Sequence, residues 1–471
     1  MKRDVPDKAK NRKWTDQGNR RYDTVRILGL GFLCAIITGA FLLSLPISTN
    51  GPIAFQDALF TAVSSVCVTG LLTVVPAVQY TLFGKIIILL LCQLGGLGIV
   101  AVVMLFFLVF NQKITVGERV MIQESYGLSG IGGTARMIRR ILIGTFAVEG
   151  VGAVLYTIAF IPVYGVRTGI WYGIFHAVSA FCNAGIDILG DSSLAAYALN
   201  PLVNVTTMLL IVLSGLGFIV WFDVLDTLRD LGRRHFSFKT CFRRLTLHSK
   251  LVLTTTPILI VGGAAAVMVL EYRNPGTIGN MNIGNKVMAS FFQSVTDRTA
   301  GFYTFSQSAM HDETKLFNML LMLIGGSSTG TAGGIKTTTA ALLVLTVIST
   351  IKGNSDAEAF GRRISAKLLR TALTIAGMAF TACMIGTFLI LCFEADTIPL
   401  TDVLYEAISA IGTVGLSADL TPRLTRESQA VLMVLMYIGR IGPLTMALMF
   451  VKKNDRVTSL RRLPEEEIMI G

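Results

Sequence analysis

Eight long apolar segments dominate this sequence, and each is long enough to cross the roughly 30 Å hydrocarbon core of a bilayer. They lie at about 27–47, 85–110, 140–164, 201–225, 250–271, 315–350, 367–394 and 428–451. Charged residues make up only 15% of the chain, whereas soluble globular proteins hold about a quarter. Because backbone groups in lipid must pair within their own segment, we expect eight spanning helices. The pattern excludes a soluble enzyme.

Four shorter apolar stretches lie between the two members of each successive pair of segments, at 54–66, 169–181, 286–297 and 399–411. About a dozen residues cannot cross a bilayer as a helix, so we expect each stretch to be a re-entrant half-helix. The sequence therefore predicts an all-α membrane protein of four repeats. Each repeat contains a spanning helix, a short pore helix, a loop and a second spanning helix, arranged around a central pseudo-fourfold pore.

The four short stretches share one register, which marks an internal repeat. Each has an aromatic residue ten positions before a glycine, and the glycines are spaced by 115, 116 and 114 residues. A serine stands six positions before the glycine in three copies, whereas the third copy has Val295 there. The glycines and the large apolar residues that follow them are Gly70–Leu71, Gly185–Ile186, Gly301–Phe302 and Gly415–Leu416.

The distribution of basic residues predicts the orientation in the membrane. Five segments, at 1–26, 111–140, 226–250, 351–370 and 452–471, hold 31 of the 41 lysines and arginines but only 14 of the 29 acids. By the positive-inside rule these segments are cytoplasmic, as are both termini. The expected organisation is an N-terminal tail (1–26), repeats at 27–110, 140–225, 250–350 and 367–451, and a C-terminal tail (452–471).

Several function classes are excluded by residue type and spacing. The seven cysteines form no CxxC pair, which argues against a disulfide framework and a zinc site. We find no catalytic constellation and expect no enzyme activity, no transition metal and no cofactor bound by this chain. The net charge of +12 reflects membrane topology and lipid contact and does not indicate nucleic-acid binding.

The repeated loops have the chemistry of a cation filter. The C-terminal end of each half-helix carries partial negative charge, which favours a cation beyond it. Extended residues before the glycine can point carbonyl oxygens inward in place of an ion's hydration shell. The expected filter residues are Val66, Cys67, Val68, Thr69 and Gly70; Phe181, Cys182, Asn183, Ala184 and Gly185; Asp297, Arg298, Thr299, Ala300 and Gly301; and Ile411, Gly412, Thr413, Val414 and Gly415.

At these loops the chain resembles a known family. VTGL (68–71) and TVGL (413–416), within four helix–loop–helix repeats, are similar to the Trk/Ktr/HKT superfamily of cation transporters. The resemblance covers nearly the whole chain and is greatest to the membrane subunits of bacterial Ktr systems, which lack two additional N-terminal helices of Trk-type relatives. Glycine in all four loops resembles the potassium-selecting members.

The resemblance implies potassium uptake across a bacterial plasma membrane, with K⁺ as substrate and Na⁺ as a candidate coupling or activating ion. It further implies a homodimer and a cytoplasmic regulatory ring of nucleotide-binding RCK subunits. The nucleotide is expected on that partner. Basic cytoplasmic residues such as Arg362 and Arg363 are candidate docking sites for the ring, although anionic lipid explains them equally well.

A second motif, GGSSTGTAGGIKTTT (325–339), lies in the middle of the sixth apolar segment. So many small residues should interrupt a helix, which lipid tolerates only where the break is buried or lines a cavity. We predict an intramembrane gating loop, the role that the resemblance implies. The alternatives are a packing kink and a phosphate-binding loop, although Ile335 replaces the glycine the latter requires. The gate residues are Gly325, Gly326, Ser327, Ser328, Thr329, Gly330, Thr331, Ala332, Gly333, Gly334 and Lys336.

Arg440 is a lone charge within the last spanning segment, and a charge at membrane depth suggests a function. The resemblance implies an electrostatic barrier below the filter. The alternative is a structural ion pair with Glu149 or Asp223.

Other transporter classes remain open. A sodium-permeable or Na⁺-coupled member of the same superfamily would keep this architecture and differ at the filter. A secondary transporter with a midplane site would also have broken helices and repeats, but usually two repeats.

Overall fold

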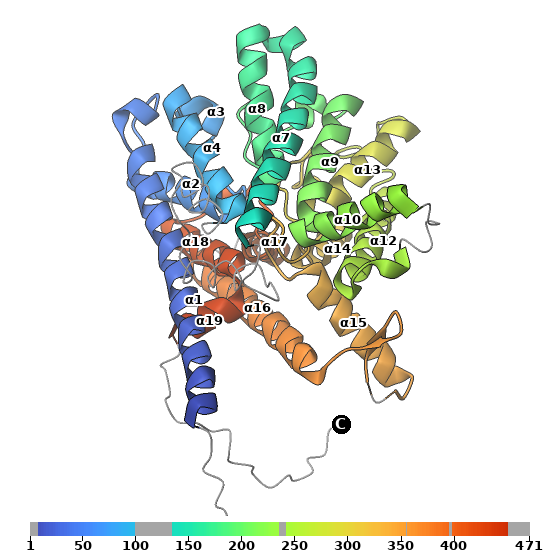
Figure 1. Ribbon diagram of the computed structural model, residues 1–471. Helices are drawn as coiled ribbons and strands as arrows, with labels where there is room; N and C mark the ends of the chain where they lie inside the picture. The colour runs from blue at the N-terminus through green and yellow to red at the C-terminus, as the bar shows by residue number, and fades with distance from the viewer. Residues whose placement is uncertain (1–7, 99–133, 235–241, 355, 395–397, 451–471) are drawn as a thin grey trace, which may run out of the picture.

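The computed structural model describes residues 8–98, 134–234, 242–354, 356–394 and 398–450, and the fold is helical (Figure 1). The expected C-terminal tail (452–471) and the end of the first repeat (99–110) lie outside the described residues. Residues 8–26 of the expected N-terminal tail belong to the first helix, which begins at Lys8, and residues 1–7 lie outside the described residues.

Within the part of the chain that the structure describes, four helices are long and apolar enough to cross a membrane. Only 28% to 33% of the residues in each apolar stretch are buried within the protein, as expected for helices that face lipid. They match the first apolar segment of each expected repeat: α1 (Lys8–Leu43), α7 (Thr134–Tyr164), α12 (Leu247–Leu270) and α16 (Ala366–Phe393).

Four short helices follow, one after each long helix, and their bounds lie within a few residues of the four short apolar stretches in the sequence. Their bounds are α2 (Phe55–Cys67), α8 (Val166–Cys182), α13 (Ile283–Thr296) and α17 (Leu400–Gly412). Their polar residues lie among buried neighbours, so protein and not lipid surrounds their C-terminal ends.

The second helix of each repeat differs from the expectation of one continuous span. The chain turns by 92° at Gly217, between α9 (Pro201–Leu216) and α10 (Phe218–Arg234), and by 98° at Gly442, between α18 (Arg426–Ile441) and α19 (Pro443–Phe450). In the first repeat α4 (Leu82–Leu97) ends at Gly98. These three glycines have φ between 82° and 92°, which a right-handed helix cannot contain.

The expected interruption of the sixth segment is confirmed. Helix α14 (Asp312–Leu323) ends before the glycine-rich stretch and α15 (Thr337–Ile351) begins after it. The loop ends at Lys336, so residues 337–339, which we assigned to it, form the first turn of α15. Because a helix and not a strand precedes the loop, the phosphate-loop interpretation is wrong.

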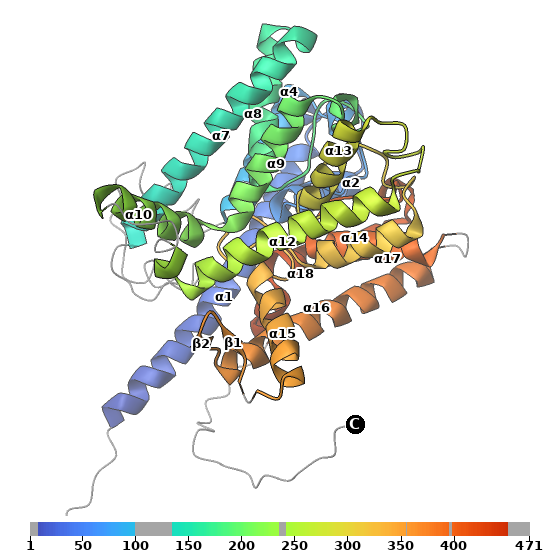
Figure 2. The ribbon, with the colours of Figure 1, turned by 90° about the vertical axis from the view of Figure 1, so that its right-hand side faces the viewer.

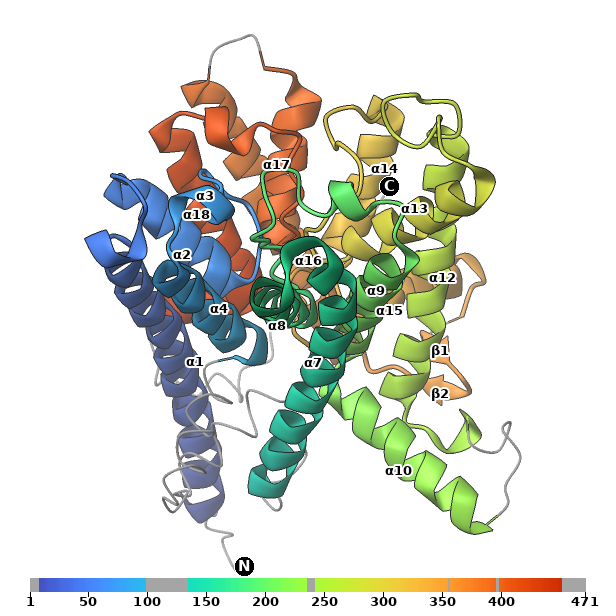
Figure 3. The ribbon, with the colours of Figure 1, turned by 90° about the horizontal axis from the view of Figure 1, so that it is seen from above.

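The four repeats occupy four sectors around a common centre, coloured blue, teal to green, yellow and orange to red in Figure 3. The remaining described elements are α3 (Pro76–Gln79), the 3₁₀ turns Pro46–Ser48, Ala195–Tyr197 and Thr421–Arg423, and the antiparallel pair β1 (Glu358–Ala359) and β2 (Arg362–Arg363). Figure 2 shows this hairpin beside α15, at the same end of the molecule as the start of α1.

Candidate functional site

The four loop glycines meet in a closed ring at the centre of the molecule, which we call the glycine ring. A Cβ atom added to Gly70 would lie 2.8 Å from the carbonyl oxygen of Ala184, the residue before the next ring glycine. The same relation holds at every step around the ring. The carbonyls faced by Gly70, Gly185, Gly301 and Gly415 are those of Ala184, Ala300, Val414 and Thr69 in that order. All four glycines have positive φ, so glycine is required both for space and for backbone conformation.

The residue two positions before each ring glycine also has a left-handed backbone. These residues have φ between 51° and 79°, and three of them are β-branched, for which such values are rare. They are Val68, Asn183, Thr299 and Thr413. Such strain persists only where the surroundings enforce it, and it concentrates at functional sites. No pattern in the sequence indicates this backbone conformation.

A hydroxyl group from each short helix braces the loop that follows it. Ser64 accepts a hydrogen bond from the Gly70 N–H at 2.9 Å, and Ser409 accepts one from the Gly415 N–H at 3.0 Å. In the other two repeats the hydroxyl donates to the carbonyl after the glycine, from Ser179 to Ile186 and from Thr296 to Phe302, both at 2.6 Å. The third repeat, where Val295 breaks the serine register, therefore uses its neighbour Thr296.

Three hydroxyl oxygens in these loops are buried without a hydrogen-bond partner: those of Thr69, Thr299 and Thr413. Buried polar atoms are nearly always paired, so these hydroxyl oxygens are available to a further partner. Hydroxyl and carbonyl oxygens are the ligands that an unhydrated monovalent cation requires. The glycine ring therefore has the chemistry of a cation site.

A cavity of about 400 Å³ opens on one side of the ring, and all four ring glycines line it. Asp187, Asp191, Asp419 and Arg423 also line this outer cavity, giving it an excess of acidic groups. Burial raises the pKa of Asp187 to about 6, while hydrogen bonds from the backbone N–H groups of the neighbouring loop act in the opposite direction. The outer cavity therefore has a negative field at neutral pH.

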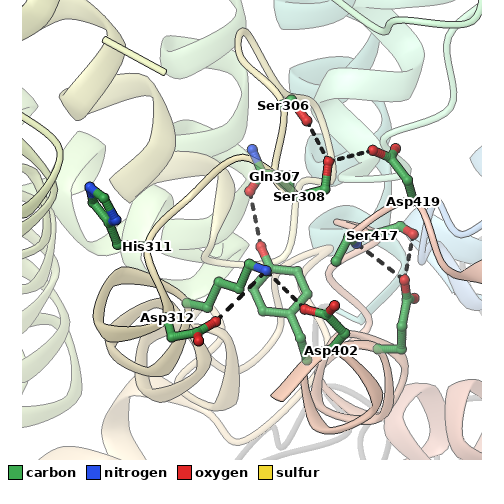
Figure 4. Close-up of polar contacts among 12 residues, drawn as sticks. Ser306, Gln307, Ser308, His311, Asp312, Asp402, Ser417 and Asp419 are labelled. Atoms are coloured by element: carbon green, nitrogen blue, oxygen red, sulfur yellow. Dashed lines mark hydrogen bonds and ion pairs between the residues drawn. The ribbon is translucent and has the colours of Figure 1, made fainter. Parts of the chain in front are cut away.

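Two other acids, at the starts of α2 and α17, are held in ion pairs. Asp57 binds Arg426 in a bidentate pair at 2.6 and 3.0 Å, and Asp402 binds Lys315 at 2.8 Å (Figure 4). Asp419 accepts a hydrogen bond from Ser308 at 2.7 Å, as the same view shows. The field at the entrance thus comes mainly from the acids that line the outer cavity.

The glycine-rich loop lies directly against the inner side of the ring. The Thr331 hydroxyl accepts from the Asn183 amide and donates to the Phe181 carbonyl, both at 3.1 Å. A Cβ atom on Gly333 would collide with the Thr413 hydroxyl. The loop therefore packs directly against the loops that carry the ring glycines.

Two basic side chains hold this loop by its backbone. Arg440 donates to the carbonyls of Thr331 and Gly95, and to that of Gly96 at 3.2 Å. Lys336 donates to the Ala332 carbonyl at 2.6 Å. Both charges thus lie in the loop region beneath the ring. Asp223, one carboxylate considered as a partner of Arg440, accepts from Thr246 instead.

The other expected filter residues contribute differently. Val66, Cys67, Phe181, Cys182, Ile411 and Gly412 belong to the last helical turns and not to extended segments. Asp297 is fully buried and accepts a hydrogen bond from Gln293 at 2.8 Å, so it braces the loop from within the protein. Arg298 donates to the Gly325 carbonyl and the Thr337 hydroxyl.

Comparisons with known proteins agree with this geometry. Residues 32–460 match the family described as TrkH, cation transport protein. The chain is 38% identical to the Ktr system potassium uptake protein B of Bacillus subtilis, over 96% of this chain and 97% of that protein. It is 39% identical to the potassium/sodium uptake protein NtpJ of Enterococcus hirae, over 96% and 98% of the two chains. The solved structure of the potassium transporter TrkH from Vibrio parahaemolyticus matches with a TM-score of 0.69 at 16% identity, over 89% of this chain and 84% of that one. This last likeness concerns the fold.

Proposed function

This chain belongs to the TrkH family of cation transport proteins, and from that premise we propose that it is the ion-translocating subunit of a bacterial potassium uptake system. The relatives that match it over nearly their whole length are named for potassium uptake. The glycine ring is the observation that carries the proposal.

In this proposal K⁺ is the substrate and binds along the axis of the glycine ring. The carbonyls of Thr69, Ala184, Ala300 and Val414 each lie against the ring glycine of a neighbouring repeat, and in this proposal they replace the hydration shell of the ion. The unpaired hydroxyls of the same loops supply further oxygen ligands. The membrane potential drives entry, at about 2.3 kcal/mol per charge per 100 mV.

The transmembrane arrangement is eight spans when each broken second helix counts as one, with α2, α8, α13 and α17 as pore helices. Repeats at 27–110, 140–225, 250–350 and 367–451 each contribute one quarter of the pore. The four long helices and the two bent pairs α9–α10 and α18–α19 account for six of these spans among the described residues, because each bent pair meets the length and hydropathy of a span when taken together. A bend at a glycine is tolerated at membrane depth where the freed backbone faces protein or a cavity.

The loop at 325–336 is the gate. It lies against the inner side of the ring, and Arg440 and Lys336 place positive charge in the path of an entering cation. Coulombic repulsion by these charges disfavours conduction until the loop moves. The loop opens when a cytoplasmic partner changes conformation.

The partners in this proposal are a second copy of the chain and a nucleotide-binding RCK ring on the cytoplasmic side. Both termini are cytoplasmic by the positive-inside rule. The β1–β2 hairpin supports a docking role, since Arg362 is exposed there and Arg363 pairs with Asp356 at the surface.

A sodium-permeable or Na⁺-coupled transporter is the second candidate function. A relative that is 39% identical is named for both potassium and sodium uptake. The same ring would serve both ions, and selectivity is therefore the property to measure.

The proposal is tested by flux into liposomes that contain the purified chain, with K⁺, Rb⁺ and Na⁺ compared. Gly70→Ser and Gly185→Ser place a side chain against the Ala184 and Ala300 carbonyls, so we expect them to lose discrimination between K⁺ and Na⁺. Gly262→Ser is the matched control, because a Cβ atom there meets nothing within 4 Å.

The potassium filter is supported if K⁺ and Rb⁺ enter rapidly and if discrimination against Na⁺ is lost in Gly70→Ser and Gly185→Ser but kept in Gly262→Ser. Equal K⁺ and Na⁺ entry into liposomes with the unmodified chain favours the sodium-permeable candidate. Absence of cation flux, even with a regulatory ring added, would contradict the proposed pore and favour a secondary transporter with a midplane site.

A further inference from the structure

A single buried side chain connects the third filter loop to the gating loop. Arg298 lies between Asp297 and Thr299 in the filter loop, and its guanidinium Nη2 donates to the Gly325 carbonyl at 3.4 Å and to the Thr337 hydroxyl at 3.2 Å. These two acceptors are twelve residues apart and stand at opposite ends of the gating loop. Only 7% of Arg298 is exposed, so the contacts are shielded from solvent.

The two ends of the gating loop pair with each other where Arg298 reaches them. We call residues 324–326 and 335–337 the neck of the loop. Gly325 N–H donates to the Ile335 carbonyl at 2.9 Å, and Thr337 N–H donates to the Gly326 carbonyl at 3.0 Å. The Thr337 hydroxyl donates to the Gly325 carbonyl at 2.9 Å. Arg298 therefore contacts both segments of the neck, and these segments are hydrogen-bonded to each other.

The filter loop also packs against the neck. A Cβ atom on Gly325 would lie 3.1 Å from the Thr299 Cγ2 atom. Thr299 has φ of 79° and precedes Ala300, whose carbonyl faces the glycine ring. If the neck moves, it therefore displaces Thr299, which adjoins Ala300 and its ring-facing carbonyl.

The guanidinium has little freedom to find other acceptors. The cavity beside it has a volume of about 10 Å³, which is room for about one water molecule. A buried cation that loses its acceptors pays the desolvation cost of an unsatisfied charge. When the neck opens, Arg298 must therefore either resist the opening or move with it.

We propose that Arg298 is a positioning residue that couples the gate to the filter: opening the neck of the gating loop shifts the third filter loop through the Arg298 contacts. This inference rests on the proposed function, because it requires that the ring selects ions and that the loop gates them. It differs from the role of Arg440, which binds the loop near Thr331, away from the neck.

The test is a selectivity change caused by a substitution at the gate. Thr337→Val removes one Arg298 acceptor without altering the filter loop, and Arg298→Lys keeps the positive charge but not the planar fork of donors. In liposomes with the full chain, we expect each variant to raise K⁺ flux and to lower the K⁺/Na⁺ flux ratio about fivefold or more. Because the two variants share the Arg298–Thr337 contact, the double variant should change the flux ratio by less than the sum of the two single effects.

Two controls separate this coupling from general loosening. Thr339 lies two residues further along α15 and is also buried. We expect Thr339→Val to change neither the K⁺ flux nor the K⁺/Na⁺ flux ratio. Arg440→Gln should raise flux while the K⁺/Na⁺ ratio stays unchanged, because it releases the loop without touching the neck.

The coupling is overturned if Thr337→Val changes flux but not the ratio, or if the effects of Thr337→Val and Arg298→Lys add. Either result leaves the proposed function intact. Absence of cation flux through the unmodified chain overturns the proposed function, and this inference with it.

Discussion

Left-handed backbone at β-branched residues is the main local signature of the site. Val68, Thr299 and Thr413 hold positive φ at equivalent positions, at about 1–3 kcal/mol of strain each. The cost recurs because the same turn must leave each short helix and direct the next carbonyl toward the ring. Because the same positive φ recurs at equivalent positions of the loops, we attribute it to the geometry of the ring and not to local packing.

A residue-scale prediction concerns Asp187 and external pH. Burial raises the pKa of its carboxyl to about 6, so the group is ionised above that pH and neutral below it. Loss of its negative charge weakens cation attraction at the outer cavity, where Asp191, Asp419, Tyr303 and Arg423 are its charged or titratable neighbours. We expect K⁺ uptake to fall about twofold or more as external pH drops from 7.5 to 5.

The measurement is initial K⁺ flux as a function of external pH. Asp187→Asn should lower uptake at pH 7.5 and flatten the profile around pH 6. A variant that keeps the wild-type profile would show that another group controls the entrance.

At the scale of elements, the ends of the second helices decide the architecture. Gly217 and Gly442 each turn the chain by more than 90°, and Gly217 lies against the Ser328 carbonyl of the gating loop. Glycines at equivalent positions in the second helices of the repeats suggest close helix packing. Gly95 and Gly439 allow such close packing, because a Cβ atom on either would collide with the Val66 or Ile411 carbonyl. Gly217 and Gly442 serve instead to end helices.

Gly217→Ala tests the link between the bend and the gate. A Cβ atom there would lie 2.5 Å from the Ser328 carbonyl, at a φ of 86°. We expect a stability loss of about 1–3 kcal/mol and faster K⁺ flux, because the loop is pushed from its closed position. Gly215→Ala is the matched control, since a Cβ atom there meets nothing within 4 Å. Thermal unfolding in detergent and liposome flux measure the two effects, and equal behaviour of both variants would contradict the prediction.

The Asp57–Arg426 pair joins the first short helix to the start of α18 in the last repeat. Because Arg426 is about half exposed, we expect Asp57→Asn to destabilise the protein by only about 1 kcal/mol. K⁺ flux at pH 7.5 should remain near wild type, unlike that of Asp187→Asn. Thermal unfolding checks the first part, and recovery of stability in the charge-swapped Asp57→Arg/Arg426→Asp variant would attribute the loss to the pair.

At the scale of the whole molecule, the glycine ring is the point where all four repeats meet. Each repeat supplies one glycine and one carbonyl, so a bound cation connects segments more than a hundred residues apart. An ion that binds this ring stabilises the fold of the entire chain by mass action.

We therefore expect K⁺ to raise the midpoint of thermal unfolding relative to an equal concentration of N-methylglucamine. At a hundred times the dissociation constant the stabilisation is about 2.7 kcal/mol. Gly185→Ser should unfold at a temperature that no longer depends on K⁺, while Gly262→Ser should keep the dependence. Equal midpoints in the two salts for the unmodified chain would contradict a K⁺ site in the ring.

The sequence by itself determined the periodic features of this protein. Apolar length predicted the long helices, and one register repeated four times predicted the short helices and the glycines that form the ring. These features are local, because lipid forces each segment to satisfy its own backbone. Arg440 and the glycine-rich interruption were also visible, since charge and small residues are unusual at membrane depth.

Only the tertiary structure decided which groups meet. It made Thr296, and not Val295, the third bracing residue. It directed Arg298 to the gating loop and placed Asp57 in an ion pair with Arg426. It also bent α9–α10 and α18–α19 at single glycines. The physical reason is that a side chain's partner, and the φ of a glycine, depend on contacts between repeats that are far apart in the chain. No local pattern encodes such contacts.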